Sequence, residues 1–219
     1  MVNPETRPRW IALEGPIGVG KTALARRIAE RLEARLVLEP VDNPFLEAFY
    51  RDRQGAAFPA QVWFLLARHR QLRDLRQVEL FQPWVVSDYL FEKDRLFARL
   101  TLDDEELATY EQLWRLLRPQ VPHPDVVVYL QARVPTLLAR IAERGREIER
   151  RISEDYLAEV VRTFDQFFFR WDGPPLLVVD TNEIDPVHED TDLDDLVDRV
   201  LGMDRRGGIE YYRPVSSRS

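Results

Sequence analysis

Five short apolar runs lie along the chain, each bounded by polar residues. They are WIAL (10–13), LVL (36–38), WVV (84–86), DVVVYL (125–130) and LLVVD (176–180). Their length and their β-branched residues predict strands buried on both faces, as in a parallel sheet. Apolar residues recur at helical spacing between these runs. The predicted helices cover residues 21–33, 45–53, 60–80, 103–117, 135–144 and 154–170.

This alternation predicts an α/β fold: a doubly wound sandwich with a five-stranded parallel sheet and ligands beyond the carboxyl ends of the strands. No internal repeat or long linker divides the chain, so we expect one domain over residues 1–205. Residues 180–198 contain nine acids and neither lysine nor arginine, which predicts a solvated loop followed by the start of a helix. The tail, 206–219, is expected to fray.

Composition narrows the class of protein. The 219 residues are 45% hydrophobic and 32% charged, as in globular proteins, and the absence of cysteine excludes disulfides and cysteine-based chemistry. There is no signal-peptide pattern and no apolar run of about 18 residues, so we expect a cytoplasmic protein without membrane contact. A net charge of −7 argues against an extended surface for nucleic acid.

Lysine is rare in this chain. Only two of the 31 basic residues are lysines, Lys21 and Lys93, and the others are arginines. Against such a bias, a position that keeps lysine can need a compact ammonium group instead of a planar guanidinium. Both lysines are therefore candidate functional residues.

The segment EGPIGVGKT (14–22) fits the phosphate-binding pattern G-x-x-x-x-G-K-[ST] and lies between a predicted strand and a predicted helix, as the pattern requires. Its backbone amides and the helix N-terminus can hold phosphates, the lysine can reach the outer phosphates and the threonine a Mg²⁺ ion. The predicted residues of this ATP and Mg²⁺ site are Gly15, Gly18, Gly20, Lys21, Thr22 and Ala23.

The motif does not identify the phosphoryl acceptor. The chain has no N-K-x-D segment to read guanine and is short for a motor, which favours a small-molecule kinase. Such a kinase needs a carboxylate at the acceptor hydroxyl and cations around the transferred group. Glu39 and Asp88 follow the second and third predicted strands and are the candidate base and Mg²⁺ ligand. The alternatives are an exposed strand-end acid for Glu39 and a helix N-cap for Asp88.

An arginine-rich segment predicts a lid. RIAERGREIERRI (140–152) sets Arg140, Arg144 and Arg146 at spacings from which a short lid, about residues 144–152, could bring them to phosphate. A solvated charged helix would look similar.

An aromatic-rich helix predicts a pocket for the acceptor. In FPAQVWFLLARHRQL (58–72), Gln61 and Arg68 lie seven residues apart and thus on nearly one face. Its aromatic residues would also suit a core. A buried Gln61 needs hydrogen-bond partners, however, and its carboxamide matches the edge of a nucleobase.

Together these segments resemble the deoxynucleoside kinase family, most closely the bacterial branch that phosphorylates deoxyguanosine and deoxyadenosine. The resemblance covers nearly the whole chain. It rests on the order and separation of EGPIGVGKT, LEPVDNPFLEAFY, FPAQVWFLLARHRQL, SDYLFEK, DVVVYLQA, RIAERGREIERRI with DYL after it, and VVDTNEIDPV. It implies a Mg²⁺-dependent transfer of phosphate from ATP to the 5′-hydroxyl of purine 2′-deoxynucleosides, and a homodimer packed through helices for which 60–80 and 103–117 are the candidates.

The resemblance also implies roles for individual residues. Glu39 would act at the 5′-hydroxyl. The other residues that would bind the substrate are Gln61, Phe64 and Arg68, with Gln61 and Arg68 at the base, Tyr50 and Glu149 at the sugar 3′-hydroxyl, and Asp88. The residues that would close over the phosphates are Arg140, Arg144 and Arg146. Asp180 to Glu183 would line the adenine of the donor, and Thr22 and Asp88 would serve Mg²⁺.

One position departs from the family pattern. Many members carry an acid-arginine-serine triplet after the third strand, where this chain has Ser87, Asp88 and Tyr89. Asp88 can replace the acid, whereas Tyr89 cannot supply the charge of the arginine. Lys93 follows about one helical turn later, and we hypothesise that its ammonium reaches the substrate or the phosphoryl site. Arg95 is the alternative.

Two other functions stay open from the sequence. A thymidylate-type nucleoside monophosphate kinase shares the loop and general fold, but its acceptor already carries a phosphate and needs a further arginine near the second or third strand. A non-catalytic nucleotide-binding subunit of this fold is the other. The presence of the loop, a candidate base and a lid argues against it.

Overall fold

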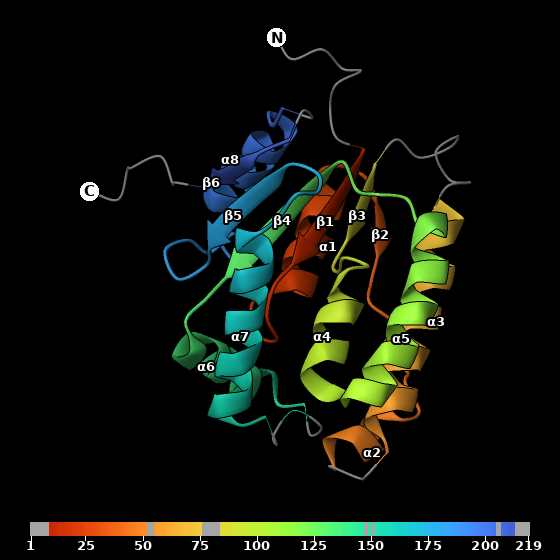
Figure 1. Cartoon of the computed structure of the whole chain (residues 1–219). Coiled ribbons are helices and arrows are strands. Elements are labelled where there is room, and N and C mark those ends of the chain that lie inside the picture. Colours follow the sequence, from red (N-terminus) through yellow and green to blue (C-terminus); the bar gives the residue numbers. More distant parts are fainter. Residues whose placement is uncertain are drawn as a thin grey trace.

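A computed structural model of the chain describes residues 9–51, 55–75, 84–146, 149, 152–204 and 207–212. Its strands form one parallel sheet in the order β2-β3-β1-β4-β5-β6 (Figure 1). They are β1 (Trp10–Glu14), β2 (Arg35–Val37), β3 (Val85–Ser87), β4 (Val126–Gln131), β5 (Leu176–Asp180) and β6 (Ile209–Tyr211). The first five confirm the predicted strands to within one residue at each end.

The sixth strand corrects the predicted five-stranded sheet, and it lies within the segment 206–219 that was expected to fray, of which the structure describes residues 207–212. Ile209 pairs with Leu176 of β5, and the Leu176 N–H donates to the carbonyl of Gly208 at 2.9 Å. The free edge of β5 offers backbone donors and acceptors that a short extended segment can satisfy, whatever its own hydrophobic pattern.

The helices are α1 (Lys21–Arg31), α2 (Leu46–Tyr50), α3 (Ala57–Arg73), α4 (Lys93–Thr101), α5 (Asp104–Leu117), α6 (Val134–Arg144), α7 (Glu154–Phe169) and α8 (Asp190–Leu201), with a 3₁₀ turn η3 (Arg118–Gln120). All six predicted helices are present. α2 and α3 end before the predicted residues 53 and 80, and positions 52–53 and 76–80 of these predictions lie outside the described residues. α4 was not predicted from the sequence. The prediction of a solvated loop within 180–198 is partly wrong, because Ile184 and Leu193 are buried, while the predicted helix start appears as α8.

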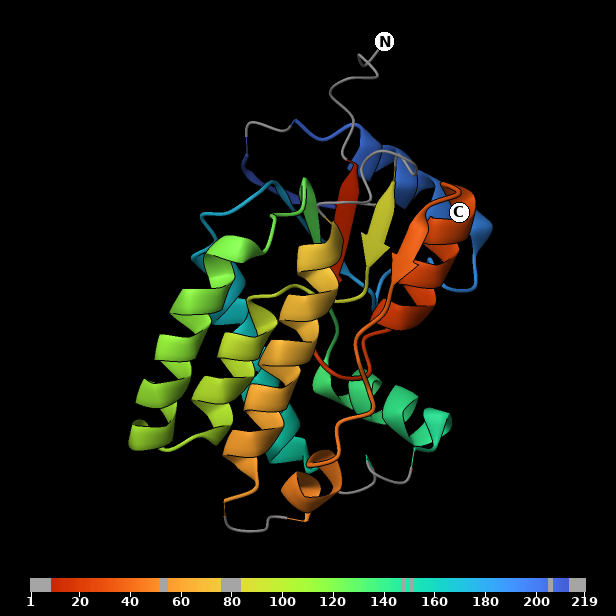
Figure 2. The ribbon, with the colours of Figure 1, turned by 90° about the vertical axis from the view of Figure 1, so that its right-hand side faces the viewer.

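The two faces of the sheet pack against different helices because successive strand side chains alternate between them. Ile11 and Leu13 of β1 belong to a buried cluster with residues of α1, α6 and α8. Ala12 belongs to a cluster with residues of α4 and α7, including Phe164. A third cluster joins α3 and α5 to the β2 side of the sheet, and Figure 2 shows α3, α4 and α5 side by side.

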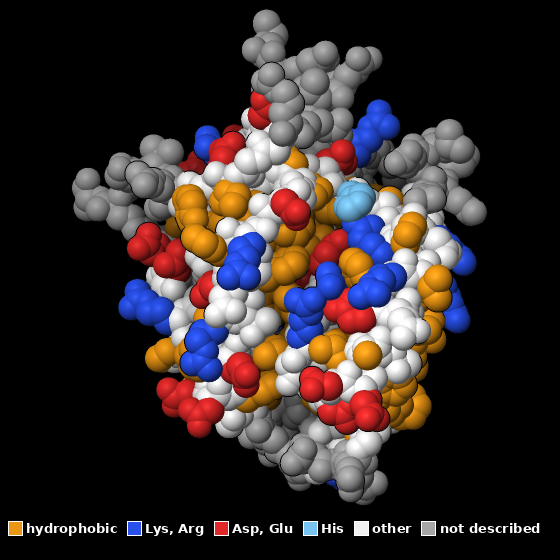
Figure 3. Space-filling model, in the orientation of Figure 1, with side chains coloured by type: hydrophobic (Ala, Val, Ile, Leu, Met, Phe, Trp, Pro, Cys, Tyr) orange, Lys and Arg blue, Asp and Glu red, His pale blue; other side chains and the backbone are white. Residues whose placement is uncertain are grey.

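One face of the molecule carries charges of both signs (Figure 3). On the face shown in Figure 3, basic and acidic side chains are interspersed, and the described residues form no continuous basic area there. Within the described ranges, no helix combines the length and apolar character needed to cross a bilayer.

Candidate active site

The phosphate-binding loop joins β1 to α1, and its backbone conformation depends on glycine. Gly15, Gly18 and Gly20 have φ angles of 152°, 86° and 102°, which L side chains rarely adopt. A Cβ added to Gly15 would also lie 2.4 Å from the carbonyl oxygen of Leu130. The loop therefore lies directly against β4, and only glycine fits at its start.

Replacing Gly18 with alanine is expected to lower the free energy of unfolding by about 2 kcal/mol or more, through backbone strain and overpacking. The added Cβ would lie 2.8 Å from Ile141 Cγ1 and 2.9 Å from the Leu137 carbonyl oxygen. Gly55→Ala is the matched control, because Gly55 has φ 74° but no atom within 4 Å of the added Cβ. Chemical denaturation followed by circular dichroism measures both variants. Equal losses would contradict the role of packing between the loop and α6.

The first turn of α1 is tied to the chain after β3. Lys21 Nζ donates to the carbonyls of Gly15 at 2.7 Å and Pro16 at 3.0 Å. Burial, followed by the charge of Lys93, lowers the pKa of Lys21 to about 8. Thr22 Oγ1 donates to Asp88 Oδ2 at 2.5 Å.

Asp88 connects three segments and is not a helix N-cap, since α4 begins at Lys93. Its Oδ2 accepts from Thr22, and its Oδ1 accepts from the Glu39 backbone N–H at 2.6 Å. Hydroxyl and carboxylate oxygens side by side are ligands that Mg²⁺ prefers, so these residues fit the predicted metal. Among the described residues no group of three or more His, Cys, Asp and Glu could hold a metal. An ion here would complete its coordination with phosphate or water.

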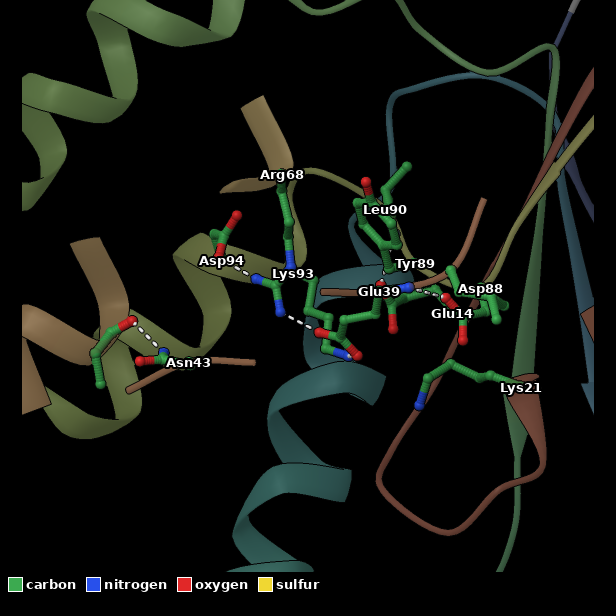
Figure 4. A network of polar contacts seen from close by, with 12 residues as sticks. Glu14, Lys21, Glu39, Asn43, Arg68, Asp88, Tyr89, Leu90, Lys93 and Asp94 are labelled. Atoms are coloured by element: carbon green, nitrogen blue, oxygen red, sulfur yellow. Dashed lines mark hydrogen bonds and ion pairs between the residues drawn. The ribbon is translucent and has the colours of Figure 1, made fainter. Parts of the chain in front are cut away.

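Glu39 lies two residues beyond β2, at the same edge of the sheet as the phosphate-binding loop. Its Oε1 accepts from Arg68 and its Oε2 from Lys93 Nζ at 2.9 Å, and Figure 4 shows both cations pointing toward it. Burial would raise the pKa of Glu39, but Lys93 and Arg68 outweigh burial and hold the pKa well below its ordinary value. Glu39 is thus an ionised carboxylate within the site and not an exposed strand-end acid.

Of the two candidate cations, the structure brings Lys93 to Glu39. The Lys93 side chain is 7% exposed. Burial would lower its pKa, but Glu39 and Glu14 outweigh burial and raise the pKa, which keeps the ammonium charged. Arg95 instead donates to Glu111 at 2.7 Å and lies 5.0 Å from the ring centroid of Trp114.

Arg68 links Glu39 to a second acid, Asp94, which the sequence analysis did not select. Its guanidinium donates to both carboxylates and lies 4.7 Å and 5.8 Å from the ring centroids of Phe64 and Tyr89. Burial raises the pKa of Asp94 to about 7, against the opposing effect of Arg68. Arg68 Nε and Asp94 Oδ2 are buried without a hydrogen-bond partner in the described part of the chain. One donor and one acceptor are therefore unused at this end of the site.

Glu14, like Asp94, is an acid of the site to which no role was assigned from the sequence. It ends β1 with 1% exposure, and its two oxygens accept from the N–H groups of Gly15 and Leu90, both at 2.9 Å. Burial raises the pKa of Glu14, while Lys93 and Lys21 lower it. This carboxylate joins the phosphate-binding loop to the turn that leads into α4 (Figure 4).

Gln61 lies on α3, on the same side as Arg68. It is 5% exposed, and its Nε2 donates to Thr101 Oγ1 at 3.0 Å. The structure thus brings Phe64 and Arg68 together and gives buried Gln61 a partner on α4. The side chain of Tyr50 lies outside the described part of the chain, so its contact with the sugar stays a prediction.

At the start of the predicted lid, Glu149 pairs with two of the predicted arginines. Gly145, with φ 67°, ends α6. Arg144 donates to Glu149 Oε2 through Nε at 3.0 Å and Nη2 at 2.7 Å, and Arg146 lies 3.5 Å from Glu149 Oε1. The structure thus brings together the three predicted site residues of the lid, Arg144, Arg146 and Glu149. Positions 147, 148, 150 and 151 lie outside the described residues.

Arg140 differs from Arg144 and Arg146, which contact Glu149. The Arg140 guanidinium donates to the phosphate-binding loop and to the segment after β5. The acceptors are the Val19 carbonyl at 3.3 Å and the Oγ1 and carbonyl of Thr181 at 2.9 and 3.0 Å. It ties α6 to the phosphate-binding loop and to the segment after β5. In that segment, exposed Asp180 accepts from the Asn182 N–H at 2.8 Å and shapes the turn.

The site residues that sequence reasoning missed are Glu14, Asp94 and Thr101. Asp94 and Thr101 belong to α4, which the spacing of Leu96, Phe97 and Leu100 could have revealed. Glu14 ends an otherwise apolar strand, where a charged residue is unusual.

Comparisons with known proteins bear on the family and the fold. The deoxynucleoside kinase family model matches residues 11–203. The deoxyguanosine kinase of Bacillus subtilis (strain 168) is 36% identical over 159 residues, which cover 71% of this chain and 76% of the relative. The deoxyadenosine/deoxycytidine kinase of that organism is 30% identical over 201 residues, or 88% and 92%. A deoxyadenosine kinase structure from M. mycoides, with products dCMP and a flexible dCDP bound, has a TM-score of 0.76 and 27% identity and covers 89% of this chain and 100% of that one.

Proposed function

Since this chain belongs to the deoxynucleoside kinase family, we propose that it transfers the γ-phosphoryl group of ATP to the 5′-hydroxyl of a purine 2′-deoxynucleoside, deoxyadenosine or deoxyguanosine. The observation that carries the proposal is the ionised Glu39, held by Arg68 and Lys93 beside the phosphate-binding loop. The purine preference is supported by the name of the deoxyguanosine kinase of Bacillus subtilis, and the name of the second relative gives deoxyadenosine together with deoxycytidine.

Glu39 acts at the acceptor hydroxyl. Its low pKa makes it a weak base, which suits a loose transition state where the hydroxyl loses its proton only as the bond to phosphorus forms. The bonds from Lys93 and Arg68 fix the direction of its oxygens. Its contribution is therefore mainly to orient the 5′-oxygen toward the phosphorus.

The donor side neutralises and positions the triphosphate. The amides of the loop and Lys21 hold the phosphates, and Arg144 and Arg146 approach the transferring group from the lid. Mg²⁺ would be held by Thr22 and Asp88 together with phosphate oxygens, and would offset their negative charge. Arg140 positions the loop, and Asp180 begins the segment that lines the adenine of ATP.

The acceptor is held at both of its ends. Gln61 and Arg68 bind the base edge, with the ring of Phe64 beside them. Tyr50 and Glu149 bind the sugar 3′-hydroxyl. The unused donor of Arg68 and acceptor of Asp94 are further polar atoms at the base end.

An ATP-coupled assay against the four deoxynucleosides and their ribose counterparts tests this function. Turnover is expected to be fastest with deoxyadenosine and deoxyguanosine, and chelation of Mg²⁺ is expected to abolish it. Turnover of dTMP with none of the nucleosides would indicate a monophosphate kinase instead. ATP binding without any turnover would indicate a non-catalytic subunit.

The family resemblance also leads us to propose a homodimer packed through α3 and α5. Leu66 of α3 is 48% exposed and Leu116 of α5 is 70% exposed, and burial of such side chains favours association. Light scattering is expected to give about twice the chain mass for the wild type. The double variant Leu66→Glu and Leu116→Glu is expected to be monomeric. A dimer that persists in the double variant would place the interface elsewhere.

A further inference from the structure

Thr101 ends α4 and is the hydrogen-bond partner of the Gln61 amide. The Thr101 hydroxyl donates to the carbonyl of Phe97, one turn earlier, at 2.7 Å. Its oxygen accepts from Gln61 Nε2 at 3.0 Å. Gln61 is 5% exposed, so its amide has few other ways to satisfy its polar atoms.

The directions of these two hydrogen bonds fix which end of the Gln61 amide faces Thr101. A hydroxyl has one proton, and here the proton goes to Phe97, so only lone pairs remain for Gln61. A flipped amide would bring its own oxygen against those lone pairs, unless the hydroxyl turned away from Phe97. The observed orientation keeps two hydrogen bonds, whereas the flipped one keeps one.

The locked amide presents its remaining donor and acceptor in a defined order. Gln61 Oε1 has no hydrogen-bond partner among the residues that the structure describes, and Nε2 retains one unused N–H. An amide whose nitrogen is held on the Thr101 side offers these two groups in one order only. A rotation of the amide would reverse that order.

Purines differ in this same order. Adenine places the N6 amino donor beside the N1 acceptor, whereas guanine places the O6 acceptor beside the N1–H donor. We propose that Thr101 is a positioning residue for base discrimination, because it locks Gln61 in the orientation that matches one of these two edges. This inference rests on the proposed function, in which Gln61 contacts the base.

The test compares two substrates in one variant. Thr101→Val removes the hydroxyl at similar volume and frees the amide, so the ratio of kcat/KM for deoxyadenosine and deoxyguanosine is expected to move toward one by about fivefold, the effect of one buried hydrogen bond. Thr101→Ser keeps the hydroxyl and is expected to keep the wild-type ratio. A partly unfolded variant lowers both values equally, so the ratio still reports discrimination.

Thr109 of α5 offers a matched control. Its hydroxyl donates to the carbonyl of Glu105, four residues earlier, at 3.2 Å, as Thr101 does to Phe97. Thr109 is exposed and belongs to no part of the proposed site. Thr109→Val is therefore expected to leave both kcat/KM values and their ratio unchanged.

Three results would overturn the inference: a wild-type ratio close to one, an unchanged ratio in Thr101→Val, or the same shift in Thr101→Val and Thr101→Ser. Equal losses on both purines would assign Thr101 a purely structural role. Failure of the proposed function is distinguishable, because the wild-type protein would then turn over neither purine deoxynucleoside.

Discussion

Replacing Glu39 with glutamine is expected to lower kcat by about 100-fold or more, because a neutral amide loses the charge-assisted bonds that orient Glu39 and cannot accept the hydroxyl proton as the bond to phosphorus forms. The KM for ATP is expected to change by less than about threefold, since the Glu39 carboxylate bonds to Arg68 and Lys93 and not to the phosphate-binding loop. Steady-state kinetics with deoxyadenosine and deoxyguanosine at saturating ATP measures both quantities.

The control for this variant is Glu47→Gln. Glu47 lies on α2 with 70% of its side chain exposed and pairs with Arg51. Its replacement is expected to leave kcat within about twofold of wild type, because exposed ion pairs contribute little. Thermal denaturation establishes that Glu39→Gln is folded, since Arg68 and Lys93 lose their charged partner. A folded Glu39→Gln protein with wild-type kcat would refute the role of Glu39.

Replacing Lys93 with methionine is expected to lower kcat/KM at least about tenfold. The variant loses a buried positive charge and the hydrogen bond that directs Glu39 Oε2 toward the acceptor. Lys93→Arg is not expected to restore full activity, because a planar guanidinium is larger and directs its donors differently from an ammonium. The measurement is kcat/KM for both purine deoxynucleosides.

Arg95→Met is the matched control for Lys93→Met. It removes a cation from the same helix, but one that pairs with Glu111 and packs on Trp114 away from Glu39. Its kcat/KM is expected to stay within about twofold of wild type. If Arg95→Met lost as much activity as Lys93→Met, or if Lys93→Met kept wild-type kinetics, Lys93 would have no specific role.

The strands and the phosphate-binding loop could be predicted from the sequence because each is formed by one contiguous segment. Each buried strand is a contiguous apolar run, and the phosphate-binding loop is nine contiguous residues with glycine where φ is positive. β6 escaped prediction because its three residues form no apolar run, and pairing with the edge of β5 is what makes them a strand. α4 escaped prediction although its apolar spacing was visible.

The acceptor side of the site could be predicted only as separate candidates. Glu39 and Asp88 were selected for their positions after two strands, and their connection through the Glu39 N–H appears only when β2 and β3 pair. The choice of Lys93 over Arg95 depends on which face of α4 points toward Glu39, and only the packing of α4 determines that face. Asp94 and Thr101 were not selected at all, because their partners lie on another helix.

The sequence by itself determined the parallel α/β fold, the phosphate-binding loop and, through the resemblance, the family. The fold and the loop depend on patterns within a few neighbouring residues, and the resemblance depends on the order and separation of short segments along the chain. Only the tertiary structure decided which side chains meet: Lys93 and Glu39 are 54 residues apart, and Gln61 and Thr101 are 40 apart. Such pairs form because strand order and helix packing set the distances between elements, and no local pattern encodes those distances.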